Sequence, residues 1–163
     1  MPTQEPLRVQ LEIGSRFENI EAVQVVLEDL LARLGLEGDT RHRTDIAVRE
    51  AVANAIEHGH GEDPSKRVSV DLAVEGGELV IQVHDQGEGF DPGEIQDRPD
   101  PDTLLEPHGR GIVLMKRFMD EIHYGRRPGG GTIVTLRRRV PAATADPRRG
   151  ESPEIGDPEE GHR

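Results

Sequence analysis

Three polar residues in one segment carry the first candidate chemistry of this chain. Glu50, Asn54 and His58 are spaced four apart within residues 49–58, so in an α-helix they lie along one side. A carboxylate can take a proton from water or a hydroxyl group. An amide oxygen is a ligand that suits Mg²⁺. The plainer alternative is an amphipathic helix whose polar residues face solvent.

A carboxylate followed by two glycines forms the second candidate. Asp85 comes directly after an apolar strand pattern, and Gly87 and Gly89 follow it. A carboxylate at a strand end can accept a hydrogen bond from an exocyclic amine such as that of adenine, and glycines allow a ligand to approach the backbone closely. The dinucleotide-binding pattern is absent, because no helix pattern follows at the right distance. The alternative is a simple turn after an edge strand.

Two glycines at the start of a predicted helix over 111–119 form the third candidate. The amides of Gly109 and Gly111, together with the helix dipole, suit the binding of phosphates, and Arg110 adds a positive charge. The alternative is a flexible first turn. The chain contains no G-x-x-x-x-G-K-[ST] sequence, which excludes a P-loop enzyme.

A glycine run before the last apolar segment is the fourth candidate. Residues 129–131 are all glycine, and Thr132 begins the segment that follows. A hairpin turn explains the glycines, and Thr132 can in addition place a hydroxyl group near a nucleobase.

Composition limits the partners that suit this chain. Its 163 residues are enough for one domain, and its net charge is −12. The absence of cysteine excludes disulfides and thiolate metal sites. The acidic balance opposes binding to nucleic acid or to an anionic membrane through bulk charge. No apolar run approaches the roughly 18 residues needed to cross a bilayer, and the N-terminus has no basic and apolar leader. We therefore expect a cytoplasmic protein.

The chain divides into three parts. Residues 1–6 are predicted to be a flexible N-terminus, and residues 7–140 a single folded domain. The segment 141–163 contains four of the twelve prolines and has no hydrophobic period, which predicts a disordered acidic tail. Within the domain, the Gly, Pro and Asp-rich segment 86–108 is predicted to be a lid loop over a ligand.

Hydrophobic periodicity indicates the elements that must position these residues. The expected elements are a strand over 8–13, helices over 17–34 and 39–58, a hairpin of strands 68–74 and 79–83, a helix over 111–119, and a hairpin of strands 121–125 and 132–138. This order predicts an α+β fold with a mixed, mostly antiparallel sheet and helices on one face.

The order of the four motifs along the chain resembles the histidine-kinase-like ATPase superfamily, over residues 7–138. The segments 49–59 and 109–120 are most similar to its anti-sigma factor serine kinase branch. The resemblance implies the two-layer α/β sandwich of the Bergerat type.

The resemblance also implies a role for each motif residue. Glu50 matches the general base and Asn54 the Mg²⁺ ligand. Asp85 matches the carboxylate that binds adenine, and Thr132 the threonine that supports this contact. His58 follows the pattern of the branch as a helix cap or an edge of the pocket. The remaining matches line the nucleotide: Gly87 and Gly89 on the adenine side, and Gly109, Arg110 and Gly111 around the phosphates.

The function implied is that of an ATP- and Mg²⁺-dependent serine/threonine-protein kinase, which phosphorylates a serine on an anti-sigma-factor antagonist of the STAS type. Glu50 favours this reading, because a hydroxyl acceptor must lose a proton whereas an imidazole acceptor needs no base. One alternative is a nucleotide-dependent binding module that sequesters a sigma factor or another regulator with little catalysis. Another is a free ATPase. The resemblance also implies a homodimer paired through the N-terminal strand and helix, although the apolar side of that strand suits the interior equally well.

Overall fold

The computed structural model describes residues 7–61, 63–87 and 107–141. The predicted flexible segment 1–6, most of the predicted lid loop 86–108 and nearly all of the predicted tail 141–163 lie outside these residues. Gly89 of the second motif also lies outside them.

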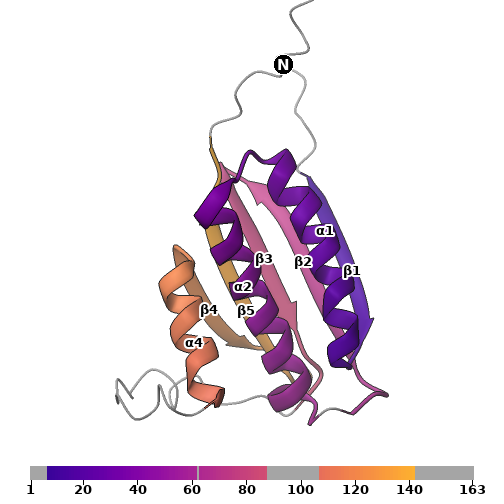
Figure 1. The fold of residues 1–163 in the computed structure, drawn as a ribbon. Coiled ribbons are helices and arrows are strands. Elements are labelled where there is room, and N and C mark those ends of the chain that lie inside the picture. The colour runs from indigo at the N-terminus through magenta and orange to yellow at the C-terminus, as the bar shows by residue number, and fades with distance from the viewer. Residues whose placement is uncertain (1–6, 62, 88–106, 142–163) are drawn as a thin grey trace, which may run out of the picture.

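A five-stranded sheet forms the base of the domain (Figure 1). Its strand order is β1-β2-β3-β5-β4, and every described pairing is antiparallel. The strands are β1 (Arg8–Gly14), β2 (Arg67–Glu75), β3 (Glu78–His84), β4 (Glu121–Arg126) and β5 (Thr132–Arg139). All the strands expected from alternating hydrophobicity are present, with ends that differ by at most one residue.

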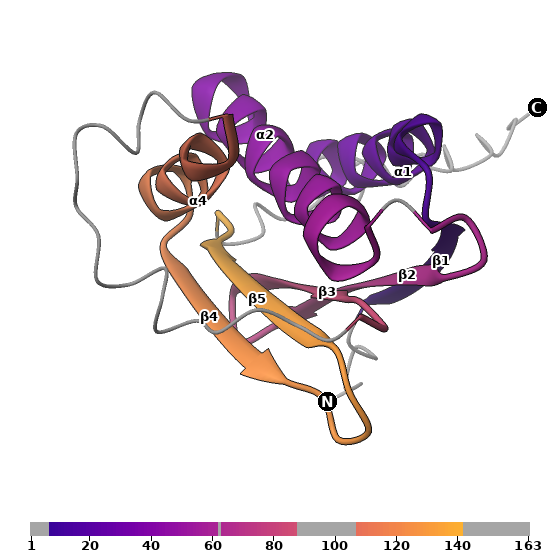
Figure 2. The same ribbon diagram turned by 90° about the horizontal axis from the view of Figure 1, so that it is seen from below.

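The helices all cover the same face of this sheet (Figures 1 and 2). They are α1 (Ile20–Arg33), preceded by a 3-10 turn (Phe17–Asn19), α2 (Gly38–Asn54), continued by a π-helical turn (Ala55–Gly59), and α4 (Pro107–Phe118). The two-layer α+β architecture expected from the sequence is therefore confirmed. None of the described helices is long and apolar enough to cross a membrane.

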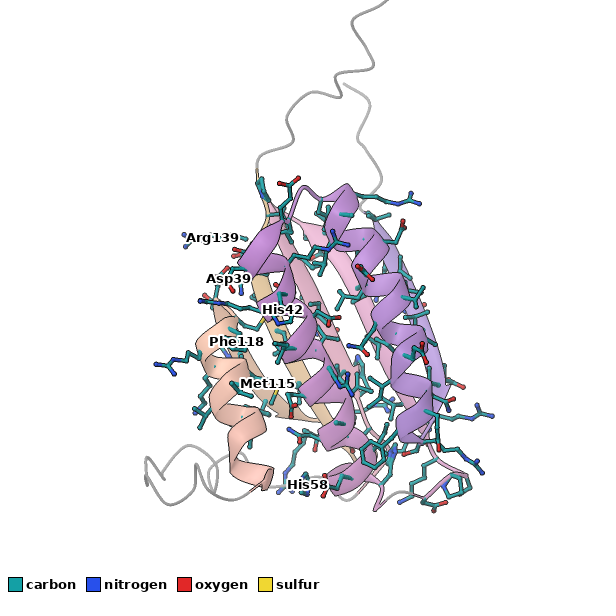
Figure 3. The ribbon with its side chains drawn as sticks, in the orientation of Figure 1. Asp39, His42, His58, Met115, Phe118 and Arg139 are labelled. Carbon is teal, nitrogen blue, oxygen red and sulfur yellow. The ribbon has the colours of Figure 1, made fainter. Side chains whose placement is uncertain are left out.

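The core lies between the helical layer and the sheet. Leu27 of α1, Val48 of α2 and Ile81 of β3 are fully buried there. Helix α4 packs against α2 through Met115, which is fully buried, and through Phe118, whose ring lies under the guanidinium of Arg43 at 5.6 Å (Figure 3). This packing fixes α4 beside α2, which matters for the site below.

The hydrophobic side of β1 belongs to this core. Val9, Leu11 and Ile13 are partly buried and pack against it. Within one chain these side chains therefore pack against the core while staying partly exposed, and the pairing of two chains through β1 stays a prediction.

Two helix ends differ from the prediction. Helix α4 begins at Pro107, four residues before the predicted start, because proline suits the first helical position, where its missing N–H costs nothing. Helix α2 does not continue as an α-helix to His58. It changes to the π-helical turn after Asn54, which alters the direction of the side chains beyond that residue.

Candidate functional site

Segments far apart in sequence meet at one end of the molecule. The ends of α2 and β3, the start of α4 and the start of β5 all lie at the lower end in Figure 1. Gly59, after α2, touches Asp85, after β3, and Gly111 of α4 touches Glu50 of α2. Two groups of predicted site residues are thus brought together, one around Asp85 and one around Glu50.

Asp85 is fixed by backbone hydrogen bonds. It is only 3% exposed, and its Oδ1 accepts hydrogen bonds from the amides of Gly87 at 3.0 Å and Thr132 at 3.1 Å. Its own amide donates to the carbonyl of Thr132 at 3.1 Å. Because every partner in these three hydrogen bonds is a main-chain atom, the carboxylate is held in one orientation before any ligand arrives.

Glycines surround Asp85 so closely that side chains would not fit. A Cβ atom on Gly59 would lie 2.5 Å from Cγ of Asp85 and 2.7 Å from its Oδ2. A Cβ on Gly87 would overlap the carbonyl of Gly59, and one on Gly131 would overlap the carbonyl of Asp85. Gly131 also has a positive φ of 98°, which favours glycine. The backbone itself therefore forms the walls around this carboxylate.

Two polar atoms of this region have no hydrogen-bond partner among the described residues. Oδ2 of Asp85 accepts no bond, whereas Oδ1 accepts two. The hydroxyl of Thr132 is buried and unpartnered. Because a buried polar atom without a partner costs free energy, the hydroxyl of Thr132 favours a ligand. Together with the unbonded Oδ2 of Asp85, this hydroxyl suits a ligand that carries both a donor and an acceptor. The amine edge of a purine fits this description.

Glu50 and Asn54 form the second group, one turn apart on α2. Both side chains are half-buried, and no hydrogen bond joins either to another described residue. A Cβ on Gly111 would lie 2.6 Å from Oε2 of Glu50 and 3.7 Å from Nδ2 of Asn54. The first turns of α4 thus lie directly against these two side chains, and only a glycine leaves room for them.

The donors of this second group suit Mg²⁺ in one particular way. Within residues 7–61, 63–87 and 107–141 no cluster of three His, Asp or Glu side chains could hold a metal. Asn54 offers an amide oxygen, and Mg²⁺ usually takes only one or two protein ligands, with phosphate oxygens and waters completing its octahedron. The residues therefore fit a metal that arrives with a phosphorylated ligand.

The start of α4 adds a positive end to this group. Gly109, Arg110 and Gly111 all lie within its first five residues, whereas the predicted helix began at Gly111. Helix N-termini present free N–H groups and a partial positive charge, which favour anions. The predicted phosphate segment thus retains its electrostatic character.

His58 differs from Glu50 and Asn54 in its surroundings. It falls in the π-helical turn, and its side chain is exposed, at the end of α2 opposite Asp39 (Figure 3). Glu50 and Asn54, in the α-helical part, are half-buried.

His60 is a site residue that sequence reasoning missed. It is 4% exposed, and its Nε2 accepts a hydrogen bond from the amide of Gln86 at 2.7 Å. Its Nδ1 lies 2.9 Å from the hydroxyl of Ser15, which is also buried. Burial lowers the pKa of His60, although the nearby carboxylate of Asp85 opposes this shift.

The sequence predicts no part in the site for Gly59, which follows the predicted helix 39–58, and it predicts Gly131 only as part of a hairpin turn. No sequence signal places either glycine against Asp85.

Comparisons with known proteins show the family of this chain. The family described as "Histidine kinase-like ATPase domain" matches residues 13–138. An anti-sigma F factor of Geobacillus kaustophilus is 32% identical over 139 residues, which is 84% of this chain and 95% of the relative. The serine-protein kinase RsbW of Bacillus subtilis is 28% identical over 133 residues, which is 78% of this chain and 83% of the relative.

A solved structure shares the fold. The crystal structure of the RsbU and RsbW domains of a Mycobacterium tuberculosis protein matches 82% of this chain with a TM-score of 0.60 and 22% identity. This chain spans 32% of that longer chain.

Proposed function

Because this chain belongs to the histidine kinase-like ATPase family, we propose that it is an ATP-dependent serine/threonine-protein kinase of the anti-sigma factor type. Its substrate would be a serine on an anti-sigma-factor antagonist of the STAS type. The observation that carries this proposal is the contact of Glu50 with the start of α4, beside Asn54. This contact supports the proposal because, if the phosphates of a nucleotide bind at the start of α4, the carboxylate of Glu50 would lie beside them.

The adenine of ATP would bind at Asp85. Its free Oδ2 would accept a hydrogen bond from the exocyclic amine, and the unpartnered hydroxyl of Thr132 would complete the contact. Since Oδ1 is already bonded to two amides, the carboxylate needs no reorganisation to bind.

The phosphates would lie between the ends of α2 and α4. The amide oxygen of Asn54 would hold Mg²⁺, which when bound compensates phosphate charge. The N-terminus of α4, with Gly109, Arg110 and Gly111, would bind the phosphate oxygens. The strong net negative charge of the chain makes these local positive groups necessary.

Glu50 would act as the general base. The serine Oγ attacks the γ-phosphorus, the bond from that phosphorus to the bridging oxygen breaks, and ADP leaves. The serine proton passes to the carboxylate of Glu50. No described residue is hydrogen-bonded to this carboxylate, so it is available to a substrate hydroxyl.

The test is a transfer assay. The full chain is incubated with Mg²⁺, γ-labelled ATP and purified STAS-type antagonists from the same genome, and the phosphorylated residue is located by mass spectrometry. We expect label on a serine of one antagonist. Binding of ATP without any transfer to serine would overturn the kinase proposal and leave the nucleotide site intact.

A second candidate function is supported by the names of several relatives. Anti-sigma F factors at 30% to 33% identity suggest a module that sequesters a sigma factor under nucleotide control. Co-purification of a sigma factor with the full chain, changed by exchanging ATP for ADP, would favour this function. Capture of an antagonist alone would favour the kinase.

A further inference from the structure

The buried side chain of His60 links Gln86, the residue after Asp85, to the rest of the domain. The amide of Gln86 donates to Nε2 of His60 at 2.7 Å. The other ring nitrogen, Nδ1, lies 2.9 Å from the hydroxyl of Ser15, which follows β1. His60 thus connects the end of β1 to the end of β3, beneath the group that we propose binds adenine.

The two hydrogen bonds determine the protonation state of the ring. A backbone amide can only donate, so Nε2 must carry no proton. The single ring proton of the neutral form therefore lies on Nδ1 and is donated to Ser15. A second proton would have to go to Nε2, where it would face the Gln86 N–H, and both would be donors.

We propose that His60 is a positioning residue of the nucleotide site, whose neutral ring holds the Asp85–Gly87 turn in its binding form and whose protonation releases that turn. The inference rests on the proposed binding of adenine at Asp85. Its consequence is a nucleotide affinity that falls in mildly acidic solution, although neither His60 nor Gln86 touches the nucleotide.

The structure around the turn explains why its release would matter. Oδ1 of Asp85 accepts from the amide of Gly87, the residue directly after Gln86. A displacement of Gln86 therefore also moves one of the two amides that orient the carboxylate. The side chain of Gln86 is held as well, since its Oε1 accepts from the amide of Arg67 at 3.1 Å, so the turn has a second support.

The charged groups that face His60 act in both directions. Burial disfavours its charged form and lowers its pKa; Lys66 acts in the same sense, while Asp85 and Asp63 favour the charged form. The net shift is downward from 6.5, so the unfolded chain binds a proton at higher pH than the folded one. The contribution of the neutral ring to folding is thus fully present above pH 6.5 and is lost as the pH falls through the lowered pKa. Nucleotide, by holding the turn, should lower this pKa further.

The experiment measures the affinity for ADP and for a non-hydrolysable ATP analogue at pH 7.5 and 5.5. Four full-length proteins are compared: the native chain, His60→Gln, His60→Leu and the control His42→Gln. His42 is exposed on α2 near the opposite end from the site (Figure 3). The control His42→Gln shows any effect of pH on nucleotide affinity that comes from the phosphates or from groups other than His60.

We expect the native chain and His42→Gln to bind more weakly at pH 5.5 than at pH 7.5, because protonation of His60 takes the acceptor from the Gln86 amide. The loss should stay below about tenfold, since the pKa of His60 lies below 6.5. His60→Gln keeps an acceptor and cannot be protonated, so its affinity should be near native at pH 7.5 and change less than twofold. His60→Leu should bind about tenfold more weakly at both values. An equal pH dependence in His60→Gln and the native chain, or native affinity in His60→Leu, would overturn the inference.

A second measurement needs neither a variant nor a nucleotide. Nitrogen-15 spectra of the native protein should show His60 as the Nδ1–H tautomer at pH 7.5, and exchange of the Gln86 amide should accelerate as the ring is protonated. Two results would overturn the inference even if no nucleotide bound. One is an Nε2–H tautomer of His60, and the other is a Gln86 amide exchange rate that does not change when the ring is protonated. Failure of all four proteins to bind nucleotide would instead overturn the proposed function.

Discussion

The two ends of the candidate site differ in how many hydrogen bonds the protein itself makes to their polar side chains and in how deeply these side chains are buried. At the adenine end, Asp85 is buried, bonded to backbone amides and enclosed by glycines. At the phosphate end, Glu50 and Asn54 are half-buried, and no described residue is hydrogen-bonded to either side chain. In the proposed site, the first end would be a preformed receptor, and the second would be a set of groups open to a ligand and a metal.

This difference follows from the chemistry expected at each end. An adenine contact must discriminate by shape and donor pattern, which rewards groups that do not move. Phosphoryl transfer needs a base that is accessible to a second substrate and a metal ligand that accepts its ion with the nucleotide. Changes at the phosphate end should therefore alter transfer, and changes at the adenine end should alter binding.

The largest effect is expected from Glu50→Gln. Loss of a general base lowers rates by about 10²- to 10⁴-fold, so transfer to the antagonist should fall in this range while ATP affinity changes less than twofold. Rates from phosphoserine formation and affinities from calorimetry give the two values. Glu21→Gln, at an exposed position of α1, is the control and should change neither. A parallel loss of binding and transfer in Glu50→Gln would abolish the proposed division between the ends.

Asp85→Asn should show the opposite pattern. The amide oxygen can still accept from Gly87 and Thr132, but its NH₂ group would face the adenine amine, so a donor would meet a donor. We expect a loss of about 2 to 3 kcal/mol in ATP binding, roughly 30- to 150-fold, with little change in the free energy of unfolding. Calorimetry and chemical denaturation measure the two quantities.

The exposed residue Asp29, on α1, supplies the matched variant Asp29→Asn. It should bind ATP as the native chain does. Equal affinities for Asp85→Asn and the native chain would mean that adenine binds elsewhere.

Gly59→Ala tests whether the glycine walls set the position of Asp85. The new Cβ would lie 2.5 Å from Cγ of Asp85, so the carboxylate or the π-helical turn must shift. Overpacking of this kind costs about 1 to 3 kcal/mol in stability, and we expect ATP affinity to fall about tenfold. Chemical denaturation measures the loss of stability, and calorimetry measures the loss of ATP affinity.

Gly125→Ala is a close control for this change. Gly125 lies in β4, nothing lies within 4 Å of its added Cβ, and its φ is not positive. Its stability should stay within about 0.5 kcal/mol of native. A similar loss in both variants would assign the effect to glycine replacement in general.

The same contrast between the ends explains how much the sequence could predict. The strands and helices follow from periodicity, because burial of one face of each element repeats along the chain. Glu50, Asn54 and Asp85 were identified because carboxylate and amide groups beside small residues suggest chemistry. Their contacts with Gly111 and Gly59 depend on how α4 and β3 pack against α2, which periodicity does not encode.

His60 and the π-helical turn show where sequence reasoning failed. A change from α- to π-helical geometry after Asn54 requires no special residue, so the sequence does not predict it. That same turn brings Gly59 against Asp85 and His60 against Gln86 and Ser15. These contacts join residues that are far apart in the chain, which a sequence pattern does not reveal.

The smallest predicted effect concerns the hydroxyl of Thr132, and it has opposite signs for folding and binding. Thr132→Val keeps the shape and removes a buried hydroxyl that has no partner among the described residues. The free energy of unfolding should stay the same or rise, whereas ATP affinity should fall about three- to tenfold, as expected for one lost neutral hydrogen bond.

Thr135→Val on the same strand is the matched control. The hydroxyl of Thr135 accepts a bond from Gln82 at 3.4 Å, on the face of the sheet away from the helices, so its loss should slightly lower stability and leave affinity unchanged. If Thr132→Val instead lowered stability and spared affinity, its hydroxyl would serve the fold. The adenine end would then be complete without a ligand, and Asp85 alone would remain to recognise the base.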